Sequence, residues 1–134
     1  GVTSNQTNTT SGSDVLVSFD ESASDNCFLQ GGVTLSSGII TVPVAGVYNV
    51  NVVARIDFIG SGYIIAKIKR NNDDGGNKDT YVISGSPSSN YENLTASDVF
   101  KCDANDTFRV TVYSDADTNW NMNNNTMFSG HLVG

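Results

Sequence analysis

The chain has 134 residues, which fits a single domain large enough to bury a hydrophobic core without help from a metal or a disulfide. Fourteen acidic and seven basic residues give a formal net charge of -7. This charge excludes the basic footprint through which proteins bind nucleic acid or an anionic membrane surface. No run of about 18 apolar residues occurs, so we expect no membrane insertion.

Polar residues fill the first part of the chain. Residues 1–13 are rich in Asn, Thr and Ser, and we interpret them as a polar lead-in segment that includes part of an edge strand. The domain itself is expected to cover residues 14–134. It opens with Val15, Val17 and Phe19, and this spacing of two is the pattern of a short strand.

The clearest strand pattern runs from Tyr48 to Phe58. Every second residue is apolar over about ten residues, and the positions between them include Arg55 and Asp57. A register shift by one residue would bury these charged side chains, so the pattern specifies which face meets the core. The preceding run, residues 38–43, is β-branched and ends in a proline, which cannot continue a central strand.

Several short strands follow, separated by segments with strong turn signals. No segment has a helical period. About eight short strands joined by loops favour a β-sandwich or jelly roll over an α/β fold. The expected strands cover residues 63–69, 81–83, 99–100, 108–113 and 127–133, and the expected loops include residues 85–93 and 115–125.

Three motifs occur in the order and spacing of a known family. Gly46-Val47-Tyr48 opens the long strand, residues 97–110 combine a strand, a turn and a strand, and Phe128-Ser129-Gly130 lies near the end. Over residues 14–133 the chain resembles the globular head domains of the complement C1q/tumour necrosis factor superfamily. The Gly-Val-Tyr and Phe-Ser-Gly motifs are the most specific parts of this resemblance.

The turn within residues 97–110 departs from the family pattern. The family has Gly-Asp at this turn, and this chain has Asn105-Asp106. Asparagine adopts a positive φ more readily than most other non-glycine residues, so we expect the turn geometry to survive.

The resemblance implies an all-β jelly-roll sandwich that assembles as a threefold homotrimer, with its termini together at a base. It implies a protein that is extracellular, either secreted or on a virion or fibre surface. Its partners would be two identical subunits and a cell-surface receptor. The loops at residues 58–62, 84–95 and 114–125 would face the apex, and residues 71–79 would lie nearer the base or flank.

The apical loop at residues 115–125 is the best candidate for a ligand-binding site, because it holds the only tryptophan. An aromatic face can stack on the C–H groups of a sugar while neighbouring amides bond its hydroxyls. The alternative is that Trp120 packs in the core or against a neighbouring subunit. The candidate ligand-binding residues of this and the other apical loop are Trp120, Asn119, Asn121, Asn123, Tyr91 and Asn90.

Two acidic turns offer the oxygen ligands that calcium prefers. Some members of the family that the chain resembles bind calcium, but the full calcium-loop pattern is absent here, and acidic turns are usually only turns. Calcium is therefore the one candidate cofactor. Its candidate ligands are Asp73, Asp74, Asp115 and Asp117.

A trimer needs a second buried face besides the core face. Some apolar residues lie out of phase with the core pattern, as residues at a threefold axis would. The alternative is that they are ordinary exposed apolar residues, which are common. The candidate interface residues are Tyr63, Ile65, Tyr113 and Met127.

Catalysis has little support in the sequence. The single histidine, His131, has no partner nearby in sequence, and no nucleophile motif is present. Cys27 and Cys102 fit no metal or redox spacing, and whether they pair stays open. We expect a non-enzymatic trimeric recognition head that binds a cell-surface glycan or protein receptor. The alternative is a structural domain that trimerises a fibre and has no ligand of its own.

Overall fold

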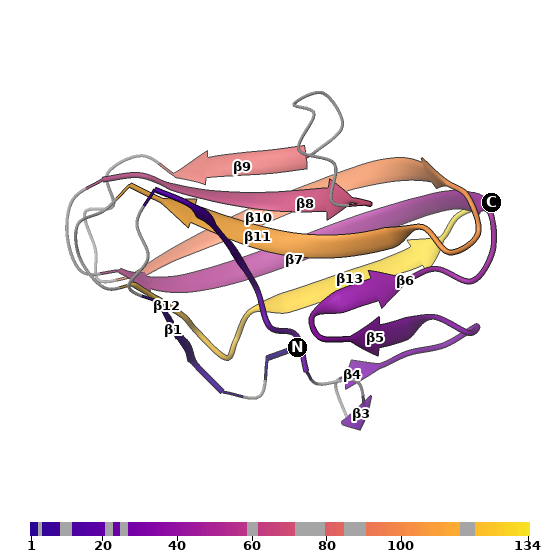
Figure 1. Ribbon diagram of the computed structural model, residues 1–134, viewed down its shortest axis with the longest axis horizontal. Coiled ribbons are helices and arrows are strands. Elements are labelled where there is room, and N and C mark those ends of the chain that lie inside the picture. Colours follow the sequence, from indigo (N-terminus) through magenta and orange to yellow (C-terminus); the bar gives the residue numbers. More distant parts are fainter. Residues whose placement is uncertain are drawn as a thin grey trace.

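A computed structural model shows two antiparallel β-sheets and a separate short hairpin (Figure 1). Every regular element in the described part of the chain is a strand, as the sequence predicts. The structure describes all residues except 3, 9–11, 21–22, 25–26, 59–61, 72–79, 85–90 and 116–119, and describes only the backbone of residues 8, 23–24, 27–28, 58 and 80–84.

The first sheet, sheet A, is built around one long strand, β7 (Gly46–Phe58). The strand β10 (Tyr91–Cys102) pairs with one edge of β7 along its length. The other edge pairs with two shorter strands in succession, β12 (Trp120–Met122) and β13 (Met127–Leu132). The lead-in segment contributes β1 (Gln6–Asn8), which pairs with β12 as the outermost strand.

The second sheet, sheet B, is centred on β11 (Thr107–Ser114) and β8 (Ile64–Arg70), which pair along most of their length. The remaining strands extend the sheet on both sides. They are β2 (Asp14–Leu16), β5 (Thr34–Ser36), β6 (Ile39–Thr41) and β9 (Thr80–Ser84), and the separate hairpin is β3 (Ala23–Ser24) with β4 (Cys27–Phe28).

The core lies between the two sheets and follows the alternation that the sequence predicts. On β7, the residues from Tyr48 to Ile56 at every second position are buried, and the intervening side chains face outward. Sheet B contributes the facing layer from β8 and β11. Each large aliphatic or aromatic side chain buried here contributes about 1.5–3 kcal/mol. The sheet B members of this layer are Ile64, Ala66, Ile68, Phe108, Val110 and Val112.

Two of the predicted loops are partly strands. Residues 91–93 begin β10, and residues 120–122 form β12 inside the segment expected to be a single loop. Both strands escaped prediction for the same reason. Their outward positions carry Asn, Thr and Ser, so the sequence predicts a polar loop. Alternate residues such as Leu94 and Met122 are nevertheless buried.

The strand ends that border the predicted apical loops do meet at one end of the sandwich. We call it the distal end, and it lies at the left of Figure 1. There Tyr91 lies opposite Asp57, Trp120 opposite Phe58 and Ser84 opposite Ile64. The C-terminus lies at the opposite, proximal end, where the Val47 N–H donates to the Gly134 carbonyl at 2.7 Å.

The N-terminus does not share the proximal end, so the expectation that both termini lie together at a base is not met. The Gly1 carbonyl accepts a hydrogen bond from the Asp20 N–H at 3.3 Å, and Figure 1 places this end of the chain near β5. Val2 is buried in the core and anchors the segment there.

The Asn105-Asp106 turn has the geometry that the sequence predicts. Asn105 has a φ of 71°, and its N–H donates to the Val42 carbonyl at 2.8 Å. The Asp106 carboxylate accepts hydrogen bonds from the Asn71 side chain at 2.8 Å and the Asp103 N–H at 3.0 Å. The bond from Asn71, against some desolvation, holds the pKa of Asp106 below its ordinary value.

The Phe-Ser-Gly and Gly-Val-Tyr motifs also have physical explanations. Gly130 lies opposite Val50, and a Cβ at this position would come within 3.0 Å of the Asn49 carbonyl oxygen. The Tyr48 ring is buried, and its hydroxyl donates to the Val44 carbonyl at 2.9 Å. Both motifs therefore follow from close packing at the proximal half of sheet A.

Two lysines clamp β2 to β8 across β11. The Asp14 carboxylate on β2 accepts Lys67 Nζ at 2.9 Å and Lys69 Nζ at 2.8 Å. Because β11 lies between β2 and β8, both lysine side chains cross above it, and Thr111 on β11 is buried. Desolvation raises the pKa of Asp14, but the hydrogen bonds from Lys69 and Lys67 outweigh it and leave the pKa below its ordinary value.

We expect Asp14→Asn to lower the free energy of unfolding at pH 7, because it removes the charged partner of Lys67 and Lys69. The expected loss is about 1 kcal/mol, since the carboxylate is partly screened by solvent. A lowered folded-state pKa stabilises the fold above the unfolded-state value of about 3.9, and this contribution is lost as the pH falls through the folded-state value. Urea unfolding should therefore show a smaller deficit at pH 3 than at pH 7. Asp103→Asn, at an exposed position, is the control, and an equal deficit at both pH values would contradict the clamp.

Candidate functional site

Polar side chains line up across the outer face of sheet A at its distal end. Asp57 on β7 lies directly between Tyr91 on β10 and Asn121 on β12, and Thr7 on β1 follows Asn121. Directly opposed residues on one face have Cβ atoms about 4.5–5.5 Å apart. The row therefore places an aromatic ring, a carboxylate, an amide and a hydroxyl within reach of one small ligand.

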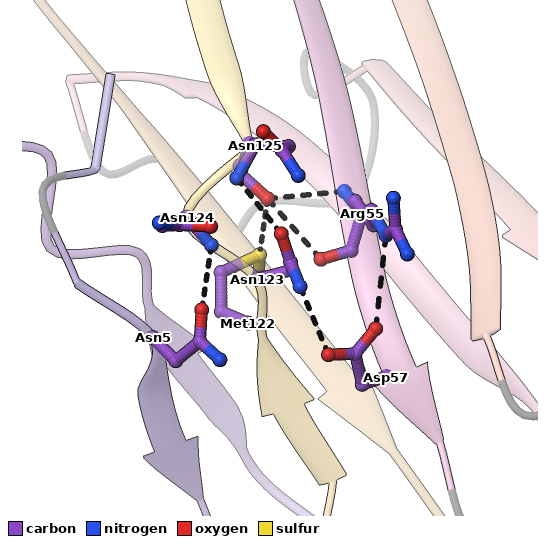
Figure 2. A network of polar contacts seen from close by, with 8 residues as sticks. Asn5, Arg55, Asp57, Met122, Asn123, Asn124 and Asn125 are labelled. Carbon is purple, nitrogen blue, oxygen red and sulfur yellow. Dashed lines mark hydrogen bonds and ion pairs between the residues drawn. The ribbon is translucent and has the colours of Figure 1, made fainter.

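Arg55 joins this row from the next outward position of β7. Its guanidinium carbon lies 4.8 Å from the centroid of the Tyr91 ring, a cation–π distance. Arg55 Nε lies 3.7 Å from Asp57 Oδ1, and the Asn123 side-chain amide donates to Asp57 Oδ2 at 2.9 Å (Figure 2). We call Arg55, Asp57, Tyr91, Asn121 and Asn123 the distal cluster.

The distal cluster is fixed by a bulge between β12 and β13. Met122 lies opposite Ile56 and Met127 opposite Val53, so the four residues between the two methionines face only two residues of β7. The Asn123 N–H still donates to the Arg55 carbonyl at 2.8 Å. This bond keeps the Asn123 side chain beside Asp57 although the regular ladder is interrupted.

Thr126 replaces the missing ladder bonds of the bulge with its side chain. Its Oγ1 accepts the Arg55 N–H at 3.0 Å and has the Arg55 carbonyl at 3.2 Å and Met122 Sδ at 3.0 Å as acceptors for its own proton. Thr126 is completely buried. Its hydroxyl therefore satisfies the Arg55 N–H, which would otherwise lose its acceptor.

The lead-in segment holds the bulge from outside. The Asn5 side-chain carbonyl accepts the Asn124 N–H at 2.9 Å, as Figure 2 shows. The Asn123 side-chain carbonyl accepts the Asn125 N–H at 2.9 Å. The asparagines in this part of the chain therefore stabilise the turn. Asn123 does so with its side-chain carbonyl, while its side-chain NH₂ group donates to Asp57.

Two polar atoms of the distal cluster are buried with no hydrogen-bond partner. They are Arg55 Nε and Asn121 Oδ1. Buried polar atoms are nearly always satisfied by protein or by ordered water. A donor and an acceptor left over on one face, beside a half-exposed aromatic ring, suit a ligand that carries hydroxyl groups.

The structure corrects the main ligand-binding prediction. Trp120 is 1 % exposed and packs in the core, so its ring face is not open to a sugar, and the alternative given for it from the sequence holds. Its position on β12 explains this, because Trp120 and Met122 point inward while Asn121 points outward.

Other predicted ligand-binding residues do come together. Tyr91 is 49 % exposed, and it shares the distal cluster with Asn121 and Asn123. Asn119 and Asn90 lie outside the described residues. Arg55 and Asp57 were not predicted as site residues, although their charged side chains at outward positions of the long strand were the available signal.

Of the four predicted calcium ligands, the structure describes only Asp115. Asp115 Oδ1 accepts the Tyr63 N–H at 2.7 Å and so caps a backbone group. Asp73, Asp74 and Asp117 lie outside the described residues. Within the described residues, no group of three His, Cys, Asp or Glu side chains is placed to hold a metal ion.

The four candidate interface residues divide between the two sheets. Ile65 and Tyr113 lie on the outer side of sheet B, and the Tyr63 ring stacks on Tyr113 there, whereas Met127 lies on the outer face of sheet A opposite Val53. Opposite faces of a sandwich cannot meet at the same threefold axis. The structure thus separates Met127 from the other three.

The remaining candidate groups lie apart from the distal cluster. His131 is exposed on β13 opposite Asn49. Cys102 is a buried free thiol, and burial raises its pKa, so it is not paired with Cys27. In the part of the chain that the structure describes, no helix is long and apolar enough to cross a bilayer.

A scan against models of known protein families finds no match for this chain, and a search of curated protein sequences finds none either.

We expect Thr126→Val to lower the free energy of unfolding by about 1–3 kcal/mol, because it leaves the Arg55 N–H buried without its acceptor while the side-chain volume stays the same. Urea unfolding measures the change. Thr95→Val, at an exposed position of β10, is the matched control and should have little effect. Equal effects of the two substitutions would contradict the role given to Thr126.

Proposed function

We propose that this chain is a non-enzymatic recognition domain that binds a cell-surface glycan or protein receptor through the distal cluster. The observation that carries the proposal is the half-exposed Tyr91 ring beside Arg55 and Asp57, with Asn121 in the same row. Such a set combines an apolar surface with fixed donors and acceptors, which is how binding sites obtain both affinity and orientation.

A neutral sugar fits the distal cluster better than a charged one. Arg55 and Asp57 carry opposite charges and lie side by side, so the pair has no net charge. The carboxylate accepts sugar hydroxyls and the guanidinium donates to them, while the Tyr91 ring offers its exposed portion to C–H groups. Asn123 already bonds Asp57 and thereby orients the carboxylate before a ligand arrives.

We further propose that the domain is a jelly roll of the complement C1q type and works outside the cell as a homotrimer. Exposed apolar residues on the outer face of sheet A support this assembly. Val53 is 41 % exposed, Met127 54 % and Val99 55 %, and Met127 lies directly opposite Val53. If these apolar residues of sheet A packed around the threefold axis, the distal cluster would lie at the rim of the trimer.

The alternative function is a structural one, in which the domain trimerises a fibre and binds nothing itself. The same apolar residues of sheet A favour it, since they need only a second copy of the chain. The two functions differ in whether the distal cluster has a ligand, and the next experiment separates them.

We expect Tyr91→Ala to weaken binding to the best neutral glycan of an array by about tenfold, because it removes the aromatic surface. Tyr91→Phe keeps the ring and should retain most of the affinity. The affinities would be measured by calorimetry, with the molar mass of each variant checked by light scattering. Unchanged affinity in Tyr91→Ala would place the ligand outside the distal cluster, whereas no glycan or cell binding by the intact protein would favour the structural function.

We expect light scattering to give about three times the 14.2 kDa chain mass. Val53→Lys should shift this mass toward that of one chain, because the trimer would bury an unpaired charge, which costs several kcal/mol. Thr34→Lys, at an exposed position of sheet B, is the control and should leave the mass unchanged. A monomeric parent protein would overturn the trimer.

A further inference from the structure

The outer side of sheet B gathers basic residues, in contrast to the acidic chain as a whole. Four of the seven basic residues lie on the adjacent strands β8 and β11, and three of them, Lys67, Lys69 and Arg109, share the outer side. Arg109 is directly opposite Lys69, and Thr111 is directly opposite Lys67. Like charges that face each other across two strands are destabilising unless an anion lies between or beside them.

One anion is already present, and it shows what chemistry this surface accepts. The Asp14 carboxylate is bonded by both Lys67 and Lys69. A single carboxylate cannot neutralise two ammonium groups, and the Lys67 side chain is 25 % exposed. The chemical group that these two lysines bind within the chain is therefore a carboxylate.

Two more donors on this side of β11 lack partners. Arg109 Nε is buried without a hydrogen-bond partner, and Thr111 Oγ1 is likewise unpartnered in a residue that is 6 % exposed. They lie two residues apart, on the same side of the strand. With Lys67 and Lys69 they place donor-bearing side chains on this side of the two strands, where the Asp14 carboxylate is already bound, and such donors suit an acceptor-rich anion.

An aromatic pair borders these donors on the distal side. The rings of Tyr63 and Tyr113 stack with centroids 5.9 Å apart and planes 25° apart. Lys67 Nζ lies 5.9 Å from the centroid of the Tyr113 ring. Tyr63 is exposed. A sugar ring that lies against Tyr63 would therefore bring its substituents toward Lys67.

We propose that this side of sheet B is a second binding site, for an acidic saccharide. The carboxylate or sulfate of the saccharide is held by Lys67 and Arg109, and one of its rings lies against Tyr63. The site is independent of the distal cluster, because it lies on the other sheet and is selective for charge. A purely structural role for the Asp14 clamp explains neither the exposed Tyr63 nor the unpartnered Nε of Arg109.

The test is a titration of the labelled protein by two-dimensional NMR at low salt with three oligosaccharides of equal length. One is derived from heparin, one is an oligogalacturonate with carboxylates only, and one is a neutral maltose oligomer. We expect saturable shifts at residues 63–67 and 109–113 with an acidic oligomer, weakening as salt is added. Binding of the heparin oligomer alone would mean that the site requires a sulfate group. Binding of both the heparin oligomer and the oligogalacturonate would mean that a carboxylate is sufficient.

Variants separate the site from general electrostatics. Lys67→Gln and Arg109→Gln should each weaken binding about tenfold, whereas Lys101→Gln removes the same charge from exposed β10 and should change it less than twofold. Arg109→Gln and Tyr63→Ala leave the Asp14 clamp untouched, so their effects do not depend on its integrity. The proposal is overturned if no acidic oligomer binds, if the maltose oligomer binds equally well, or if all three charge variants behave alike. Shifts confined to Asp57, Tyr91 and Asn121 would belong to the distal cluster and would also overturn it.

Discussion

The pleat of β7 is the constraint on which the rest of the molecule depends. Its inward residues make the centre of the core, and its outward residues, Arg55 and Asp57 among them, make the centre of the distal cluster. Both edges of the strand are paired, so its register is held from two sides. A shift by one residue would bury the charged pair and expose the core at the same time.

The sequence predicted the parts of the fold that depend on alternation and on turn chemistry. The strand from Tyr48 onward and the positive φ of Asn105 are examples, since each depends on a local rule that few residues satisfy. The start of β10 was missed because its outward residues are polar. Its inward residues, such as Leu94, are too few to reveal the strand without the partner that β7 provides.

The candidate site was predicted only in part, and Trp120 shows why. Composition identified an aromatic residue among amides, but which side chain faces solvent depends on whether the segment is a loop or a strand. Once residues 120–122 pair with β7, alternation turns Trp120 inward and Asn121 outward. Arg55 and Asp57 join Asn121 through pairings between segments far apart in the sequence, and no local pattern contains that information.

The bulge opposite Arg55 has a consequence for how chains of this type can vary in length. The four residues between Met122 and Met127 lie against two residues of β7, so the bulge adds two residues to this edge of the sheet. Because two is an even number, the alternation of inward and outward side chains continues unchanged from β12 to β13. A related chain with one residue more or fewer between Met122 and Met127 would reverse the phase of one of the two strands. Trp120 would then leave the core, or Met127 would enter it. Length variation in this segment is therefore restricted by parity, with changes of two residues tolerated better than changes of one.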